Sequence, residues 1–216
     1  MESNSSSLVI EAPFPSRRTR RWKPKKDIDR VNAFPPAVSV VFSQEVLVGV
    51  DQHLSLSLEY EAGGFLLGNR YCCPNSGRNY VIIDQYSPAK FIESTQINLS
   101  FTHEAWAQMS DELSGKFLGK LIIGWYHSHP GMGVFLSTSD LMIHEGRFPE
   151  PWMFALVVDP KSHEAGVFGW LNREIDARRV FDFYELFERH SRTSVVTWNN
   201  YRAALSSLNR RPLMPK

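Results

Sequence analysis

Short apolar segments recur along the middle of the chain, and their lengths and spacing predict β-strands. They are rich in β-branched and aromatic residues and are separated by turn-forming Gly, Pro, Asn and Ser. The longest of them, KLIIGWYHSH at 120–129, is apolar almost throughout, as expected of a central strand covered on both faces. The six predicted strands span 37–43, 63–72, 79–88, 120–129, 152–159 and 165–171.

Three other segments show helical spacing of apolar residues behind a side chain that can cap a helix. Ser43 precedes QEVLVGVDQHLSLSLE, Thr102 precedes a helix that runs to about Leu113, and Ser137 precedes a helix that ends near 147. Helices mixed with strands through short loops predict one α/β (α+β) domain.

The two ends of the chain differ from this middle part and define three predicted regions. Residues 1–35 hold a Ser cluster, several prolines and the basic run SRRTRRWKPKK (16–26), so we expect a flexible basic tail. Residues 36–188 form the folded domain. We expect 189–216 to be a helical extension and tail, with RTSVVTWNNYRAALSSLNR as its amphipathic helix.

Charge and cysteine content exclude several classes of protein. The formal net charge is +1, so the chain as a whole has no strong attraction for nucleic acid or an anionic membrane. No apolar run approaches the roughly 20 residues that cross a bilayer. The only cysteines, Cys72 and Cys73, are neighbours and form no disulfide framework, which favours a reducing compartment and predicts a cytoplasmic protein.

The stretch GWYHSHPGMGVFLSTSD (124–140) holds the candidate chemistry. His127 and His129 share one face of the predicted strand, since side chains two apart point the same way. Ser137 and Asp140, three apart, share a face of the first helical turn. Each pair alone has an ordinary explanation, as polar residues at a strand end and as a helix cap. Together, two imidazoles and a carboxylate form a ligand set that favours zinc and leaves one position open.

This stretch resembles the signature of the JAMM (MPN+, JAB) zinc metalloproteases. His127-Ser128-His129 is followed by PGMGVFL and then by Ser137-Thr138-Ser139-Asp140, without departure from the family pattern H-x-H, seven residues, S-x-x-D. The upstream pattern E-x-x-G-x-L-x-G is also present, as EAGGFLLG starting at Glu61. The resemblance covers roughly residues 36–188. The sequence of this stretch is similar to that of prokaryotic family members linked to ubiquitin-like conjugation systems.

The resemblance implies a fold, a mechanism and a set of partners. The fold would be a mixed β-sheet flanked by helices, of the cytidine-deaminase-like kind. His127, His129 and Asp140 would hold one catalytic zinc ion, Glu61 would act as general base and then acid, and Ser137 would stabilise the oxyanion. The reaction would be cleavage after the C-terminal glycine of ubiquitin or a ubiquitin-like modifier.

Other interpretations of the sequence stay open at this point. The domain could be a non-catalytic MPN scaffold within a larger assembly, or a DNA-associated JAB protein that uses its basic tail. Conjugation enzymes are further candidate partners, whereas nucleic acid and membrane are not expected ones. His144, one helical turn beyond Asp140, is a candidate for supporting the metal ligands from behind.

Overall fold

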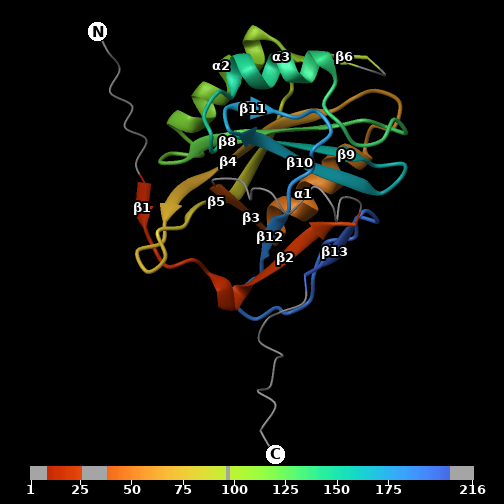
Figure 1. The fold of residues 1–216 in the computed structure, drawn as a ribbon. Helices are drawn as coiled ribbons and strands as arrows, with labels where there is room; N and C mark the ends of the chain where they lie inside the picture. The colour runs from red at the N-terminus through yellow and green to blue at the C-terminus, as the bar shows by residue number, and fades with distance from the viewer. Residues whose placement is uncertain (1–8, 26–37, 96–97, 205–216) are drawn as a thin grey trace, which may run out of the picture.

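In the part of the chain that the structure describes, a curled 11-stranded β-sheet is flanked by three helices, and two further short strands form a separate two-stranded sheet (Figure 1). The computed structural model describes residues 9–25, 38–95 and 98–204. Within these residues the helices are α1 (Gln44–Ser55), α2 (His103–Ser114) and α3 (Thr138–Arg147), with a short 3-10 turn at Ser16–Arg18. The strands are β1 (Val9–Glu11), β2 (Thr19–Pro24), β3 (Val38–Ser43), β4 (Gly63–Cys72), β5 (Asn79–Pro88), β6 (Ile92–Ser94), β7 (Leu99–Phe101), β8 (Leu121–Ser128), β9 (Phe154–Asp159), β10 (Glu164–Leu171), β11 (Glu174–Ile175), β12 (Phe183–Leu186) and β13 (Tyr201–Ala203).

The predicted mixed α+β domain is confirmed, and so are its capping residues. The sheet order is β11-β10-β9-β8-β4-β5-β3-β12-β2-β13, so β8 is a central strand between antiparallel β4 and parallel β9. Ser43, Thr102 and Ser137 each accept a hydrogen bond from a backbone N–H in the first turn of the helix that follows. The six predicted strands correspond to β3, β4, β5, β8, β9 and β10.

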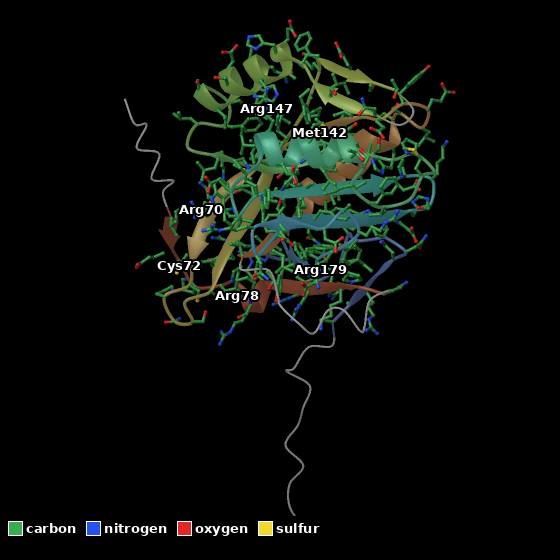
Figure 2. All side chains as sticks on the ribbon, turned by 45° about the horizontal axis from the view of Figure 1, so that its top comes forward. Arg70, Cys72, Arg78, Met142, Arg147 and Arg179 are labelled. Atoms are coloured by element: carbon green, nitrogen blue, oxygen red, sulfur yellow. The ribbon has the colours of Figure 1, made fainter. Side chains whose placement is uncertain are left out.

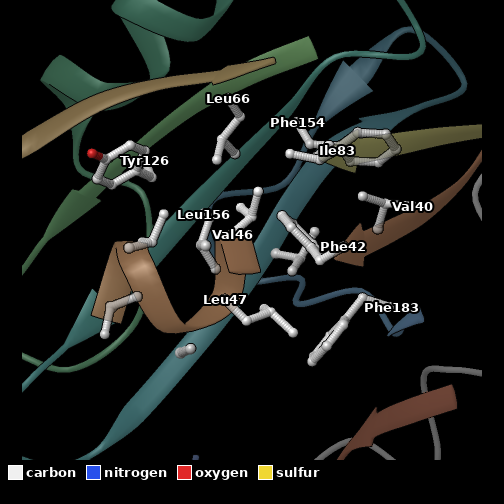
Figure 3. Close-up of a cluster of buried hydrophobic side chains, with 14 of the residues drawn as sticks. Val40, Phe42, Val46, Leu47, Leu66, Ile83, Tyr126, Phe154, Leu156 and Phe183 are labelled. Carbon is white, nitrogen blue, oxygen red and sulfur yellow. The ribbon is translucent and has the colours of Figure 1, made fainter. Parts of the chain in front are cut away.

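The sheet curls around α1, and the alternation along its strands separates two cores. Leu66 of β4, Tyr126 of β8 and Leu156 of β9 face α1 and pack with Val46 and Leu47 (Figure 3). The neighbouring positions in the sequence point to the other face, where α2 and α3 lie (Figure 1). The pairing of β8 with β4 shifts register between Ile122 and Gly124, and beyond this irregularity the odd-numbered residues Trp125 and His127 face the side of α3.

The described part of the predicted N-terminal tail is folded, so the prediction of a flexible arm is wrong for residues 9–25. β2 pairs with β12 and β13, and arginines of β2 and of the 3-10 turn before it have partners from the far end of the chain. Arg18 donates to the carbonyl of Phe187, Arg20 lies over the Phe187 ring, and Arg21 forms an ion pair with Asp182. These partners lie more than 150 residues away in the sequence, so no local pattern reveals them.

The predicted C-terminal helix is also wrong for the residues that the structure describes. Residues 189–200 form turns and irregular backbone, and β13 then pairs antiparallel with β2. Trp198 and Tyr201 are buried against Phe183, so the apolar spacing reflects docking onto the sheet. Residues 205–216 lie outside the described residues.

No helix in the described ranges is long and apolar enough to cross a membrane. Cys72 and Cys73 are both free thiols, at the end of β4 and in the turn that follows. A reducing, cytoplasmic location stays a prediction.

Candidate metal centre

The C-terminal end of β8 brings His127 and His129 to the same place. Both side chains are buried, and their Nε2 atoms lie 3.1 Å apart. The N–H of His129 donates to the carbonyl of Val158 at 2.9 Å, which extends the pairing of β8 with β9 by one residue. Ser128 points the other way, as predicted, and its Oγ accepts from the N–H of Ala62.

A glycine-rich loop returns the chain from β8 to the start of α3. Gly131 and Gly133 have φ angles of +84° and +83°, in the left-handed region that favours glycine. At the end of this loop Ser137 and Asp140 form a capping box. The Oγ of Ser137 accepts from the N–H of Asp140 at 3.1 Å, and Asp140 Oδ2 accepts from the N–H of Ser137 at 2.6 Å. The cap thereby fixes the orientation of the Asp140 carboxylate.

The three predicted ligands converge. His127, His129 and Asp140 offer ligand atoms that all lie within 4.8 Å of one another, and no second such group of His, Cys, Asp or Glu occurs in the described part of the chain. Asp140 Oδ1 lies 3.3 Å from His127 Nε2, and Oδ2 lies 3.4 Å from His129 Nε2. All three side chains are at most 2% exposed.

The electrostatics of this cluster fit a cation. Burial lowers the pKa of His127 and outweighs the opposing effect of Asp140, so that imidazole is neutral. Although burial favours the protonated acid, the electrostatic effect and hydrogen bond of the His127 imidazole, with further hydrogen bonds from His129 and Ser137, hold the pKa of Asp140 well below its ordinary range. A neutral imidazole facing a second imidazole nitrogen at 3.1 Å, beside an ionised carboxylate, is a donor set that a borderline divalent ion satisfies.

Glu61, from the segment before β4, lies beside the three candidate ligands. It lies two residues before the strand begins, its N–H donates to the carbonyl of Thr95, and its Oε1 lies 3.6 Å from His129 Nε2. The side chain is 2% exposed, yet neither carboxylate oxygen has a hydrogen-bond partner. Burial raises the pKa of Glu61 to about 7; the electrostatic effect of His129 opposes this rise and the charge of Asp140 adds to it. An unpartnered carboxyl that titrates near neutrality is suited to proton transfer.

Two residues behind the cluster support His127. Trp125, two positions earlier on the same face of β8, stacks on the His127 ring at 4.4 Å between centroids and 10° between planes. The indole Nε1 donates to His144 Nδ1 at 3.1 Å. Burial lowers the pKa of His144 to about 4, so it stays a neutral acceptor. His144 thus lies behind Trp125, on the inner side of α3, and reaches His127 only through that ring, whereas Met142 lies on the exposed side of the helix (Figure 2).

Sequence reasoning missed Trp125 and a second buried residue, Asp159. For Trp125 the available signal was its spacing of two from His127 within a strand. Asp159 ends β9 and accepts from the N–H groups of Gly131 and Gly133 at 2.8 and 2.9 Å. Its only local signal was the Asp-Pro turn at 159–160, which is typical of any strand end.

Comparison with known proteins places this arrangement among described families. The model of the JAB1/Mov34/MPN/PAD-1 ubiquitin protease family matches residues 37–146. COP9 signalosome complex subunit 5 of Yarrowia lipolytica is 33% identical over 147 residues, which are 66% of this chain and 36% of that protein. Ubiquitin carboxyl-terminal hydrolase RPN11 of Saccharomyces cerevisiae is 33% identical over 107 residues, 48% of this chain and 35% of that protein.

The name of one archaeal relative refers to a different activity from those of the family and of RPN11. NAD(+) hydrolase TcpA of a Theionarchaea archaeon is 29% identical over 109 residues, 50% of this chain and 30% of that protein. The chain spans between 22% and 38% of the length of the first four curated relatives. The likeness is therefore to one region of larger proteins.

Proposed function

Because the chain belongs to the JAB1/Mov34/MPN/PAD-1 ubiquitin protease family, we propose that it is a zinc-dependent isopeptidase or peptidase. Its substrate would be ubiquitin or a ubiquitin-like modifier, cut after the C-terminal glycine. The observation that carries this proposal is the buried, unpartnered Glu61 carboxyl, 3.6 Å from an imidazole of a complete His-His-Asp cluster.

His127, His129 and Asp140 would hold the zinc ion. When bound, zinc would supply the Lewis acidity that makes water a nucleophile near neutral pH and polarises the scissile carbonyl. The capping box orients Asp140 and the Trp125 ring orients His127, so the ligands are positioned before the metal arrives. Such preorganisation favours tight binding.

Glu61 would move the proton in both halves of the reaction. It would take one proton from the attacking water and deliver it to the leaving amine when the C–N bond breaks, which leaves the carboxyl as it began. Its position at the edge of the cluster and its pKa of about 7 suit both steps at neutral pH.

Ser137 would stabilise the negative charge that develops on the carbonyl oxygen. Its Oγ already accepts from the N–H of Asp140, so the hydroxyl proton is available to an oxyanion. The same side chain therefore caps α3 and serves the transition state.

The choice of modifier tail as substrate is supported by chemistry as well as by family. A tail that ends in glycine has little side-chain bulk and can lie extended along a strand, where main-chain hydrogen bonds bind it. The names of the family and of the yeast relative RPN11 both refer to ubiquitin. The modifier, its conjugates and the enzymes that attach it are the partners we propose, in a cytoplasmic setting.

Neither alternative is favoured by the structure. A scaffold without catalysis has no need for a buried carboxyl beside a complete ligand set. A DNA-binding arm at 16–25 conflicts with the partners that Arg18, Arg20 and Arg21 have within the fold.

The test is cleavage of linear fusions between ubiquitin-like modifiers and a reporter peptide, with the cut site read by mass spectrometry. We expect cleavage after the modifier's last glycine, loss of cleavage after chelation and its return with zinc. A matched fusion with the terminal glycine changed to valine should resist. Zinc-loaded protein that cleaves none of the fusions would contradict the proposal.

A further inference from the structure

Asp159 is a buried carboxylate whose hydrogen bonds join two loops. It is 1% exposed, and it accepts from four backbone N–H groups. Oδ1 receives Gly131 at 2.8 Å, Lys161 at 2.9 Å and Ser162 at 3.2 Å, and Oδ2 receives Gly133 at 2.9 Å. One side chain thus holds the turn between β9 and β10 and the loop between β8 and α3.

The loop between β8 and α3 needs an external anchor. It connects His129 to the cap of α3, and so it sets the distance between a histidine ligand and Asp140. Two of its residues, Gly131 and Gly133, have left-handed φ angles on either side of Met132. The N–H of Met132 closes a turn onto the carbonyl of His129, and the two glycine N–H groups both reach Asp159.

We propose that Asp159 is a positioning residue of the metal centre: it holds the Gly131–Gly133 loop in the conformation that brings His129 and Asp140 to one ion. The proposal rests on the zinc site of the proposed function. Asp159 touches no ligand side chain and acts through backbone alone. Burial favours its protonated form, but the four N–H donors outweigh burial and keep its pKa below the ordinary value, so the acceptor stays charged.

The turn that shares Asp159 is itself braced by the C-terminal segment. Asn200 pairs with both backbone groups of Ala165 through its side-chain amide, and the side chain of Asn199 donates to the carbonyl of Ser162. The anchor of the loop is therefore continuous with the segment that holds Asn199 and Asn200. Asp159 and the residues that brace its turn lie outside residues 37–146, which the family model matches.

The first test replaces Asp159→Asn and measures zinc affinity by competition with a chelator. The amide keeps one oxygen but turns an N–H₂ group toward a backbone N–H, so one anchor is lost. We expect zinc to bind 10- to 100-fold more weakly, the usual effect of losing a group that orients ligands. In metal-free protein the amides of Gly131 and Gly133 should exchange at least about tenfold faster. Asp182→Asn, which breaks the ion pair with Arg21 far from the loop, should change neither quantity.

A second pair of variants applies if Asp159→Asn does not fold. Gly133→Ala and Gly119→Ala introduce the same strain, since φ is +83° and +82° and an added Cβ meets nothing within 4 Å at either position. We expect equal losses in Tm but weaker zinc binding only for Gly133→Ala. A zinc Kd within twofold of wild type for both Asp159→Asn and Gly133→Ala would overturn the proposal.

Failure of this proposal differs from failure of the proposed function. Wild-type protein that binds zinc but cleaves no modifier fusion would defeat the function and leave the Asp159 effect on zinc intact. Wild-type cleavage together with unchanged zinc affinity in the Asp159 variant would defeat the positioning role alone.

Discussion

Two buried glutamates, in different regions of the molecule, have opposite surroundings. Glu185 in β12 accepts four hydrogen bonds: Gln44 and the N–H of Val195 reach Oε1, and Trp22 and Ser194 reach Oε2. Glu61 is almost as buried, yet both of its oxygens lack a partner. The first carboxylate joins β2, α1, β12 and the C-terminal segment, whereas the second faces the cluster of His127, His129 and Asp140.

The difference separates stability from chemistry. A buried carboxylate with a full set of donors stabilises the segments that donate, because removing it leaves those donors unsatisfied. A buried carboxylate without donors destabilises the fold and is kept available for a proton. We therefore expect changes at Glu61 to affect turnover and changes at Glu185 to affect folding.

The largest expected effect is on turnover in Glu61→Gln. The amide cannot take up a proton, so kcat should fall by about 10²- to 10⁴-fold, the usual contribution of a general acid and base. Steady-state kinetics on a cleavable fusion measure it. Glu59→Gln, an exposed neighbour, should keep the wild-type rate, and a Glu61→Gln variant with that rate would remove Glu61 from the mechanism.

Ser137→Ala should affect both stability and turnover, because a helix cap and an oxyanion donor are lost together. We expect kcat to fall by about 10²- to 10³-fold and the free energy of unfolding to fall by about 1 kcal/mol. Ser43→Ala removes the equivalent cap of α1 and provides the control. The Ser43→Ala variant should lose a similar free energy of unfolding while its kcat stays unchanged. Equal losses of kcat in both variants would indicate that Ser137 acts only as a helix cap.

Glu185→Gln should lower the free energy of unfolding by about 3 kcal/mol, since the new N–H₂ group would face two hydrogen-bond donors and cannot accept a hydrogen bond from either. Urea denaturation of the metal-free protein measures this change. Turnover per folded molecule should stay within twofold of wild type. A large loss of kcat with unchanged stability would reverse the roles that we assign to the two glutamates.

The pH dependence of stability provides a smaller effect at Glu61. Its pKa in the folded, metal-free protein is about 7 against an ordinary value of 4.5, so the folded state holds this proton more tightly than the unfolded state. Stability is therefore lost as pH rises from about 4.5 to 7. Glu61→Gln should be more stable than wild type by about 3 kcal/mol at pH 8 and equal to it near pH 4. Thermal denaturation at both pH values measures the difference. A stability difference between the variant and wild type that is the same at pH 4 and pH 8 would exclude this effect of the Glu61 pKa.

The central fold and the site could be predicted from sequence because their signals are local. Helix caps, strand alternation and the spacing from His127 to Asp140 all lie within a few residues of the structure that they specify. The register that brings Glu61 beside β8 is not local, and it was inferred from resemblance to a family. Asp159 was missed because its partners Gly131 and Gly133 lie 28 and 26 residues away.

The terminal segments could not be predicted for the same physical reason. β2 is a run of cations whose favourable contacts come from Phe187, Asp182 and β13, at the other end of the chain. β13 in turn has only three residues, too few for a periodic signal. Each segment forms a strand because the other is present, so a charge block was interpreted as a tail and an apolar spacing as a helix.

Counting bound zinc by native mass spectrometry tests most directly whether the buried cluster is a metal centre with a separate base beside it. We expect one ion per chain in wild type and in Glu61→Gln, and none in Asp140→Ala at the same free zinc concentration. Wild-type protein without zinc, or Asp140→Ala with as much zinc as wild type, would contradict it.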